Sequence, residues 1–117
     1  MIQRLVTQSD GIVFSTPEYH GSMSSVAKLI IENLSYPSVL AAKPVVMMGV
    51  AAGGIGAIKT LEQLRGTLSH IGAIVLPFPV SVPRVHKVFN KDGTCNDETI
   101  ESLLRGLADR LLEYIDG

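Results

Sequence analysis

Three short apolar runs, each followed by a stretch with helical periodicity, constrain the fold of this chain more than any other feature of its sequence. The runs are residues 12–14, 45–50 and 73–76, and the second of them, VVMMGV, is continuously apolar. Such a run is typical of a strand that is covered on both faces. The repeated order of strand and helix predicts an α/β fold with a parallel sheet and right-handed crossovers. We expect one domain over residues 1–117, because a chain of this length has room for one modest core.

Capping residues and apolar spacing predict three helices between and after these strands. The first begins near Ser24 or Ser25, the second ends at Gly72, and the third begins near Asn96 or Asp97. Apolar residues at three- and four-residue spacing predict one buried face on each helix. These faces comprise Val26, Leu29, Ile30 and Leu34 in the first helix, Ile58, Leu61, Leu64, Leu68 and Ile71 in the second, and Ile100, Leu103, Leu104, Leu107, Leu111 and Leu112 in the third.

Prolines mark the end of the third strand. Because proline cannot donate to a sheet ladder, the prolines between positions 77 and 83 predict that residues 78–96 are mostly loop. Arg84 and His86 lie in this loop, where a basic side chain either meets an anionic ligand or, more commonly, is solvated.

Composition excludes several classes of function. Ten basic and eleven acidic side chains give a formal net charge of -1, and no basic cluster marks a nucleic-acid partner. No apolar run reaches the roughly 18 residues that span a bilayer, and the N-terminus lacks the profile of a signal peptide. The single cysteine, Cys95, excludes an internal disulfide and fits a reducing compartment. We therefore expect a cytoplasmic protein that engages neither nucleic acid nor membrane.

The loop expected after the first strand, residues 16–24, lies at the carboxyl end of the sheet, where open α/β sheets bind ligands. Pro17, Gly21 and several serines leave its main-chain amides accessible, so the loop is suited to lie flat against a polar ring. An ordinary turn accounts for the same residues equally well, with Glu18 then a solvated charge. His20 has no Cys, Asp or second His nearby, and no metal site is expected.

The loop after the second strand is rich in glycine, which permits close approach of a ligand or merely tight packing of the next helix. Residues 49–56, GVAAGGIG, fit a G-x-x-x-G-x-G pattern that resembles the nucleotide turn of short-chain dehydrogenases. Three features weaken that interpretation: no acidic residue ends the next strand, no Tyr precedes a Lys by four residues, and the turn does not follow the first strand. Signatures of nucleophilic hydrolases, Walker loops and zinc enzymes are missing from the sequence.

Taken together, three stretches resemble the NADPH-dependent FMN reductase family, which has a flavodoxin-like fold. They are DGIVFSTPEYHGSMSSVAK, KPVVMMGVAAGGIGAIKTLEQLR and GAIVLPFPVSVPRVHKVFNKDG, and the match is collinear from about Ser9 to the last helix. The resemblance implies FMN and NAD(P)H as cofactors and hydride transfer from NAD(P)H to the flavin, which carries the reaction. No acid-base residue is required, so we expect no catalytic side chain.

The resemblance also implies that two segments border the isoalloxazine ring of FMN. The second segment carries alanines where the family commonly has a small polar residue, and His20 stands where asparagine is frequent. The first segment comprises Pro17, Glu18, Tyr19, His20, Gly21 and Ser22, and the second comprises Gly49, Val50, Ala51, Ala52, Gly53 and Gly54.

The chain departs from the family in its extent. A flavodoxin-like sheet has five strands in the order 2-1-3-4-5, and the resemblance covers only the last three. The loop that holds the FMN phosphate in the family belongs to the unmatched part, so we expect a partial domain with weak FMN binding and weakened activity. We also expect a homo-oligomer, a dimer or higher, because the apolar strand at residues 11–15 would have an open edge.

Two other functions remain open at this point. A non-catalytic flavodoxin-like module that acts through oligomerisation would keep the fold and bind no flavin. A nucleotide-binding fragment of the short-chain dehydrogenase type would bind pyridine nucleotide without flavin.

Overall fold

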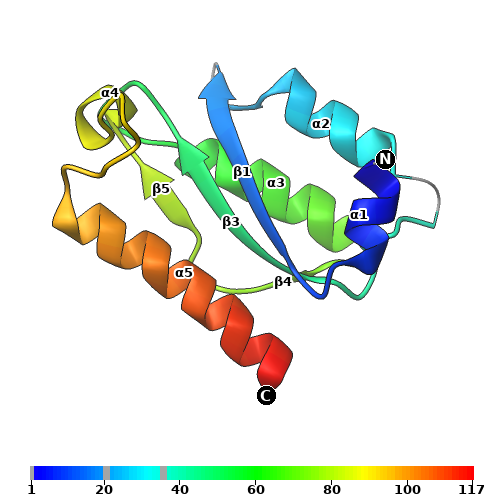
Figure 1. The fold of residues 1–117 in the computed structure, drawn as a ribbon. Coiled ribbons are helices and arrows are strands. Elements are labelled where there is room, and N and C mark those ends of the chain that lie inside the picture. Colours follow the sequence, from blue (N-terminus) through cyan, green and yellow to red (C-terminus); the bar gives the residue numbers. More distant parts are fainter. Residues whose placement is uncertain (1, 20–21, 35–36) are drawn as a thin grey trace.

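The computed structural model describes residues 2–19, 22–34 and 37–117. Helices and strands alternate along most of the chain (Figure 1). In chain order they are α1 (Ile2–Gln8), β1 (Ile12–Tyr19), β2 (Ser22–Met23), α2 (Ser25–Glu32), β3 (Pro44–Val50), α3 (Ile58–His70), β4 (Ile74–Val75), β5 (Val80–Val82), α4 (Val85–Val88) and α5 (Glu98–Asp116).

The sheet is built around β3. Its order is β2-β1-β3-β4, and β5 also pairs with β3. Strands β1, β4 and β5 all run parallel to β3, which confirms the predicted parallel sheet. In the β1–β3 ladder, Ile12 lies opposite Val45 and Pro17 lies opposite Val50. The short β2 is antiparallel to the end of β1.

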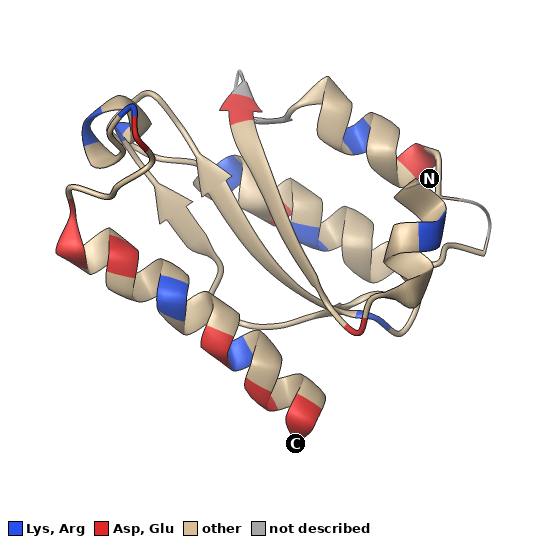
Figure 2. Ribbon diagram, in the orientation of Figure 1, with Lys and Arg blue, Asp and Glu red and all other residues tan. Residues whose placement is uncertain are grey.

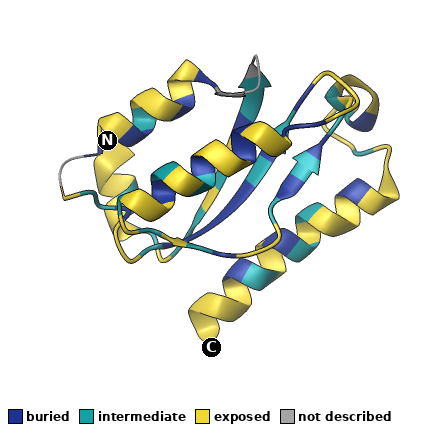
Figure 3. Cartoon of the chain, turned by 180° about the vertical axis from the view of Figure 1, so that it is seen from behind, coloured by how far each residue is buried: buried dark blue, intermediate teal, exposed yellow. Residues whose placement is uncertain are grey.

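Helices cover both faces of this sheet, giving three layers (Figure 1). Successive side chains of a strand point to opposite faces, so neighbouring residues of β3 enter different cores. Val45 and Met47 pack with residues of α2 and α3, whereas Val46 packs with residues of β5, α4 and α5. All three side chains are buried. Figure 3 shows that buried residues follow the sheet and the inner helix faces, with exposed residues outside.

The first strand is longer than the sequence predicts. Residues 16–19 were expected in a loop, but they continue β1, because Thr16 and Pro17 pair with Gly49 and Val50 of β3. The strand then pairs at Glu18 with Met23 of β2. A proline is tolerated here because β1 has only the two-residue β2 on its other side.

The third strand is divided into two pieces. Residues 74–75 form β4, and the chain then leaves the ladder and returns as β5. Residues 78–96 are mostly loop, as predicted, but the prediction missed β5 and α4. Prolines on either side of Phe78 interrupt the donors of the ladder, and Phe78 itself has a φ of 63°. This kink brings Val80 opposite Met48.

The predicted helix ends agree well with the structure. Ser24 caps α2, and its Oγ accepts a hydrogen bond from the N–H of Ala27 at 3.0 Å. Asp97 caps α5 in the same way through the N–H of Ile100 at 3.1 Å. Helix α3 stops before Gly72, whose φ of +91° suits glycine.

Several residues of the predicted apolar faces are exposed, and helix α1 was not predicted. Helix α5 lies mainly against β3 and β5, so part of its apolar surface faces solvent. Helix α2 buries only Ala27 and Ile31. The exposed residues that we expected to be buried are Val26, Leu29, Ile58, Leu103 and Leu112.

Within the described residues, no helix has the length and apolar character needed to cross a membrane.

Candidate functional site

The carboxyl ends of β1, β3 and β5 lie at one end of the sheet, beside α4 (Figure 1). Because Pro17 pairs with Val50, the two segments predicted to border a ligand start side by side. The structure therefore brings together the described parts of both segments. His20 and Gly21 lie outside the described residues.

The first segment is tied to the start of α3. The Oε1 atom of Glu18 accepts a hydrogen bond from the N–H of Thr60 at 3.2 Å, and Glu18 is partly buried. Thr60 is in the first turn of α3, where the helix dipole favours a negative charge. Glu18 thus links the end of β1 to α3, and it is not the solvated charge of the alternative interpretation.

Thr16 holds the same segment through side-chain hydrogen bonds. Its side chain is only 1% exposed, and its Oγ1 accepts a hydrogen bond from the N–H of Ser24 at 3.4 Å while donating to the carbonyl of Pro17 at 3.1 Å. These bonds join the strand to the helix cap across the β1–β2 hairpin. Sequence reasoning used Thr16 only as a strand boundary, although a threonine directly before Pro17 is a position where the hydroxyl can reach local main-chain groups.

The second segment begins with close packing and ends in an exposed turn. A Cβ on Gly49 would lie 2.7 Å from the Cβ of Ala57, so this glycine is needed for the approach of α3 to β3. Ala51 is buried and its N–H donates to the carbonyl of Val82 at 2.9 Å. Ala52, Gly53 and Gly54 are exposed.

The turn from Ala52 to Gly54 presents main-chain donors. Among the described residues, no hydrogen-bond partner exists for the N–H groups of Ala52, Gly53 or Gly54. A Cβ on Gly53 would meet nothing within 4 Å. Within the described residues, this exposed turn therefore carries three consecutive unpaired N–H groups, which suit an acceptor such as the polar edge of a heteroaromatic ring or an oxyanion.

Hydrogen bonds hold this turn against the end of β5. The carbonyl of Gly53 accepts from the N–H of Arg84, and the carbonyl of Ala51 accepts from the N–H of Val85, each at 3.0 Å. On the other side of the turn, Ser81 Oγ accepts from the N–H of Ala57 at 2.7 Å. The polar Ser81 in an otherwise apolar strand was the sequence signal for this contact, and it was missed.

Charges of both signs gather at this end of the molecule. Figure 2 shows acidic colour at the tip of β1 and basic colour on α4. No group of three His, Cys, Asp or Glu residues that could hold a metal ion is found in the described part of the chain.

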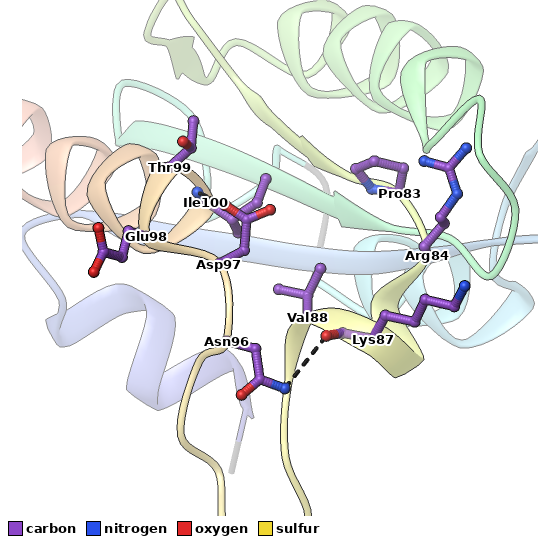
Figure 4. A pocket seen from close by; sticks show the side chains of 9 residues that line it. All are labelled: Pro83, Arg84, Lys87, Val88, Asn96, Asp97, Glu98, Thr99 and Ile100. Carbon is purple, nitrogen blue, oxygen red and sulfur yellow. Dashed lines mark hydrogen bonds between the residues drawn. The ribbon is translucent and has the colours of Figure 1, made fainter.

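A cavity of about 490 Å³ between α4 and the start of α5 lies beside this site (Figure 4). Its walls include Arg84 and Lys87 on one side and Asp97 and Glu98 on the other. Asp97 is committed to capping α5, and Asn96 donates from its side chain to the carbonyl of Lys87 at 3.4 Å. None of the residues predicted to border FMN lines the cavity, so we do not place the FMN site there.

The parallel sheet, its two helical layers and the ligand-side turns define a flavodoxin-like α/β protein. Among solved structures, FerB, a flavoenzyme NAD(P)H:(acceptor) oxidoreductase from Paracoccus denitrificans, superposes with a TM-score of 0.84 and 26% identity, covering 97% of this chain and 65% of that one. The predicted fold class is thereby confirmed.

The family model for NADPH-dependent FMN reductases matches residues 1–87, and the chain belongs to that family. It is 32% identical over 114 residues to an NADPH azoreductase of Bacillus sp. (strain OY1-2), covering 97% of this chain and 61% of the relative. It is 29% identical over 103 residues to an NAD(P)H-dependent FMN reductase of Pseudomonas aeruginosa, covering 86% and 56%. The chain thus spans about six tenths of the length of these relatives. The resemblance is confirmed, and the short-chain dehydrogenase interpretation is not favoured.

Proposed function

We propose that this chain is the ring-binding part of an NAD(P)H-dependent FMN reductase, which transfers hydride from NAD(P)H to FMN. Family membership supports the reaction class. The observation that carries the proposal is the exposed turn at Ala52, Gly53 and Gly54, next to the end of β1, whose N–H groups have no partner among the described residues.

The residues present fit FMN. The turn offers donors to the polar edge of an isoalloxazine ring, and its side chains are no larger than a methyl group. Pro17 and the tied Glu18 give a rigid wall on the neighbouring strand. In this proposal the cofactor-facing residues are Pro17 to Ser22 on the first segment and Gly49, Ala51, Ala52, Gly53 and Gly54 on the second.

Bound FMN would accept and pass on the hydride, while the protein binds and orients the two cofactors. The chain's own contribution is main-chain hydrogen bonding at residues 52–54 and the exclusion of water by the wall at Pro17. No side chain is assigned as a proton donor or acceptor, so no catalytic residue is proposed.

We further propose that residues 1–117 form a single, partial flavodoxin-like domain that associates with a second copy. What supports this is the outer edge of β1: within the described residues, positions 12–17 pair with β3 only. Val13 on this strand is 53% exposed. We also propose a cytoplasmic location, since the reaction draws on NAD(P)H, and cell fractionation tests it.

The test of the proposed function is a titration of the purified chain with FMN, followed by quenching of flavin fluorescence, with NADPH oxidation measured on the same sample. Saturable quenching together with NADPH oxidation supports the proposal. No quenching at millimolar FMN overturns it and favours the non-catalytic module.

A further inference from the structure

Arg84 has a backbone conformation that its residue type does not favour. Its φ of 46° and ψ of 50° place it in the left-handed region, shared among the described non-glycine residues only with Ala42 and Phe78. Such a conformation is unfavourable for an L-residue and persists where the surroundings impose it. Here the N–H of Arg84 is bound to Gly53 and that of Val85 to Ala51. The hydrogen bonds of two consecutive N–H groups, at Arg84 and Val85, therefore hold the strained residue against the glycine turn.

The guanidinium of Arg84 crosses the same turn. A Cβ built on Gly54 would lie 2.5 Å from Arg84 Nη2 and 3.0 Å from Cζ, so the guanidinium lies in the space that a side chain at Gly54 would occupy. The charge is thus carried directly onto the surface that presents the free N–H groups of Ala52, Gly53 and Gly54.

The charge of the Arg84 guanidinium has no partner among the residues that the structure describes. In the described part of the chain, the ion pairs are Lys28–Glu32 and Arg105–Glu101, and the Arg84 side chain takes part in no hydrogen bond. Figure 4 shows Arg84 across the cavity from Asp97 and Glu98. Two residues that follow closely in sequence, His86 and Lys87, are also basic and exposed. An exposed, unpaired guanidinium beside main-chain donors is a typical partner of phosphate, because its fork binds two oxygens at once.

We propose that Arg84 binds a phosphate group of the nicotinamide nucleotide and so determines which nucleotide the protein uses. This inference rests on the proposed function, since it places the nucleotide at the turn that faces FMN. The phosphate is either the 2′-phosphate, which NADPH alone carries, or the pyrophosphate, which NADPH and NADH share. The two sources give different results on substitution.

Arg84→Asn is the informative variant, because asparagine tolerates the left-handed conformation and removes the charge. Arg84→Lys keeps the charge without the bidentate fork. Arg4→Asn, on exposed α1, is the matched control. Each variant is compared for the FMN Kd, the KM for NADPH and for NADH, and the calorimetric Kd of 2′,5′-ADP and of ADP. Circular dichroism melting establishes that each is folded.

We expect Arg84→Asn to raise the KM for NADPH and the Kd of 2′,5′-ADP by about tenfold or more, with the FMN Kd within about twofold. For Arg84→Lys we expect these two constants to lie between those of Arg84→Asn and the unsubstituted chain. For Arg4→Asn we expect them to equal those of the unsubstituted chain. A rise confined to NADPH and 2′,5′-ADP assigns the 2′-phosphate, and a rise for both nucleotides assigns the pyrophosphate.

Unchanged nucleotide constants in a folded Arg84→Asn protein overturn the inference. A raised FMN Kd with unchanged nucleotide constants also overturns it, because the guanidinium then serves the flavin. If Arg84→Asn does not fold, Arg84→Lys decides by the same constants. Failure of the unsubstituted chain to bind FMN is a different result, which overturns the proposed function; the calorimetric titrations then still test Arg84.

Discussion

The carboxylate of Glu18 accepts a hydrogen bond from the main-chain N–H of Thr60 at 3.2 Å, joining the end of β1 to the first turn of α3. These residues are 42 positions apart in the sequence, and the bond fixes the wall of the site against the helix that follows the glycine turn. Site geometry and fold stability are therefore linked at this contact.

Glu18→Ala should lower the free energy of unfolding by about 1–2 kcal/mol, because it leaves the Thr60 N–H without its acceptor. Glu18→Gln retains a side-chain oxygen and should lose less. Urea unfolding followed by circular dichroism measures both. Equal stability of Glu18→Ala and the unsubstituted chain would show that the bond contributes nothing.

Gly49→Ala should destabilise the protein by about 1–3 kcal/mol, because the added methyl would lie 2.7 Å from Ala57 Cβ and 3.3 Å from Leu61 Cγ. Gly53→Ala is the matched control, since its Cβ has open space. Thermal unfolding of the two proteins is the comparison, and a Tm for Gly49→Ala equal to that of Gly53→Ala contradicts the packing argument.

Ser81→Ala should cost about 1 kcal/mol by removing the acceptor of the Ala57 N–H. Gly56→Ala should cost more, because Gly56 has a φ of +83° and its Cβ would lie 2.5 Å from Ser81 Oγ. In the double variant the clash is gone but the backbone strain remains. The double variant should therefore lose less stability than the sum of the losses in the two single variants. Strict additivity in urea unfolding would exclude the contact.

Val13→Lys should weaken self-association, because a charge on an open strand edge opposes pairing with another chain. Sedimentation velocity at several concentrations gives the distribution of species. Lys91→Glu, on an exposed loop, is a control that also changes charge. A monomer that dominates in the unsubstituted chain would be evidence against the proposed oligomer.

The sequence predicts the parts of this fold that depend on local signals. Continuous apolar character marked β3, and the side-chain caps Ser24 and Asp97 marked the starts of α2 and α5. The longer β1 and the separate β5 depend on pairing with β3 and on the kink at Phe78. No residue pattern within either segment encodes those partners.

The site, like the fold, was predictable only where local sequence signals determine it. The glycine turn was visible as a motif, because glycines directly after a buried strand indicate a tight turn that a ligand or a helix approaches closely. The ties at Glu18 and Arg84 were not visible, since each joins segments far apart in the sequence. Residue type alone predicts neither the hydrogen bond of the Thr60 N–H nor the left-handed backbone of Arg84.

In the proposed function FMN lies on the turn at Gly53, and a matched pair of substitutions tests this placement. Gly53→Leu and Gly66→Leu both add a side chain where a Cβ meets nothing within 4 Å, but Gly66 lies on the exposed side of α3. If FMN lies on this turn, Gly53→Leu raises the FMN Kd by at least about tenfold, while Gly66→Leu leaves it unchanged and both proteins stay folded. An FMN Kd for Gly53→Leu equal to that for Gly66→Leu would contradict it.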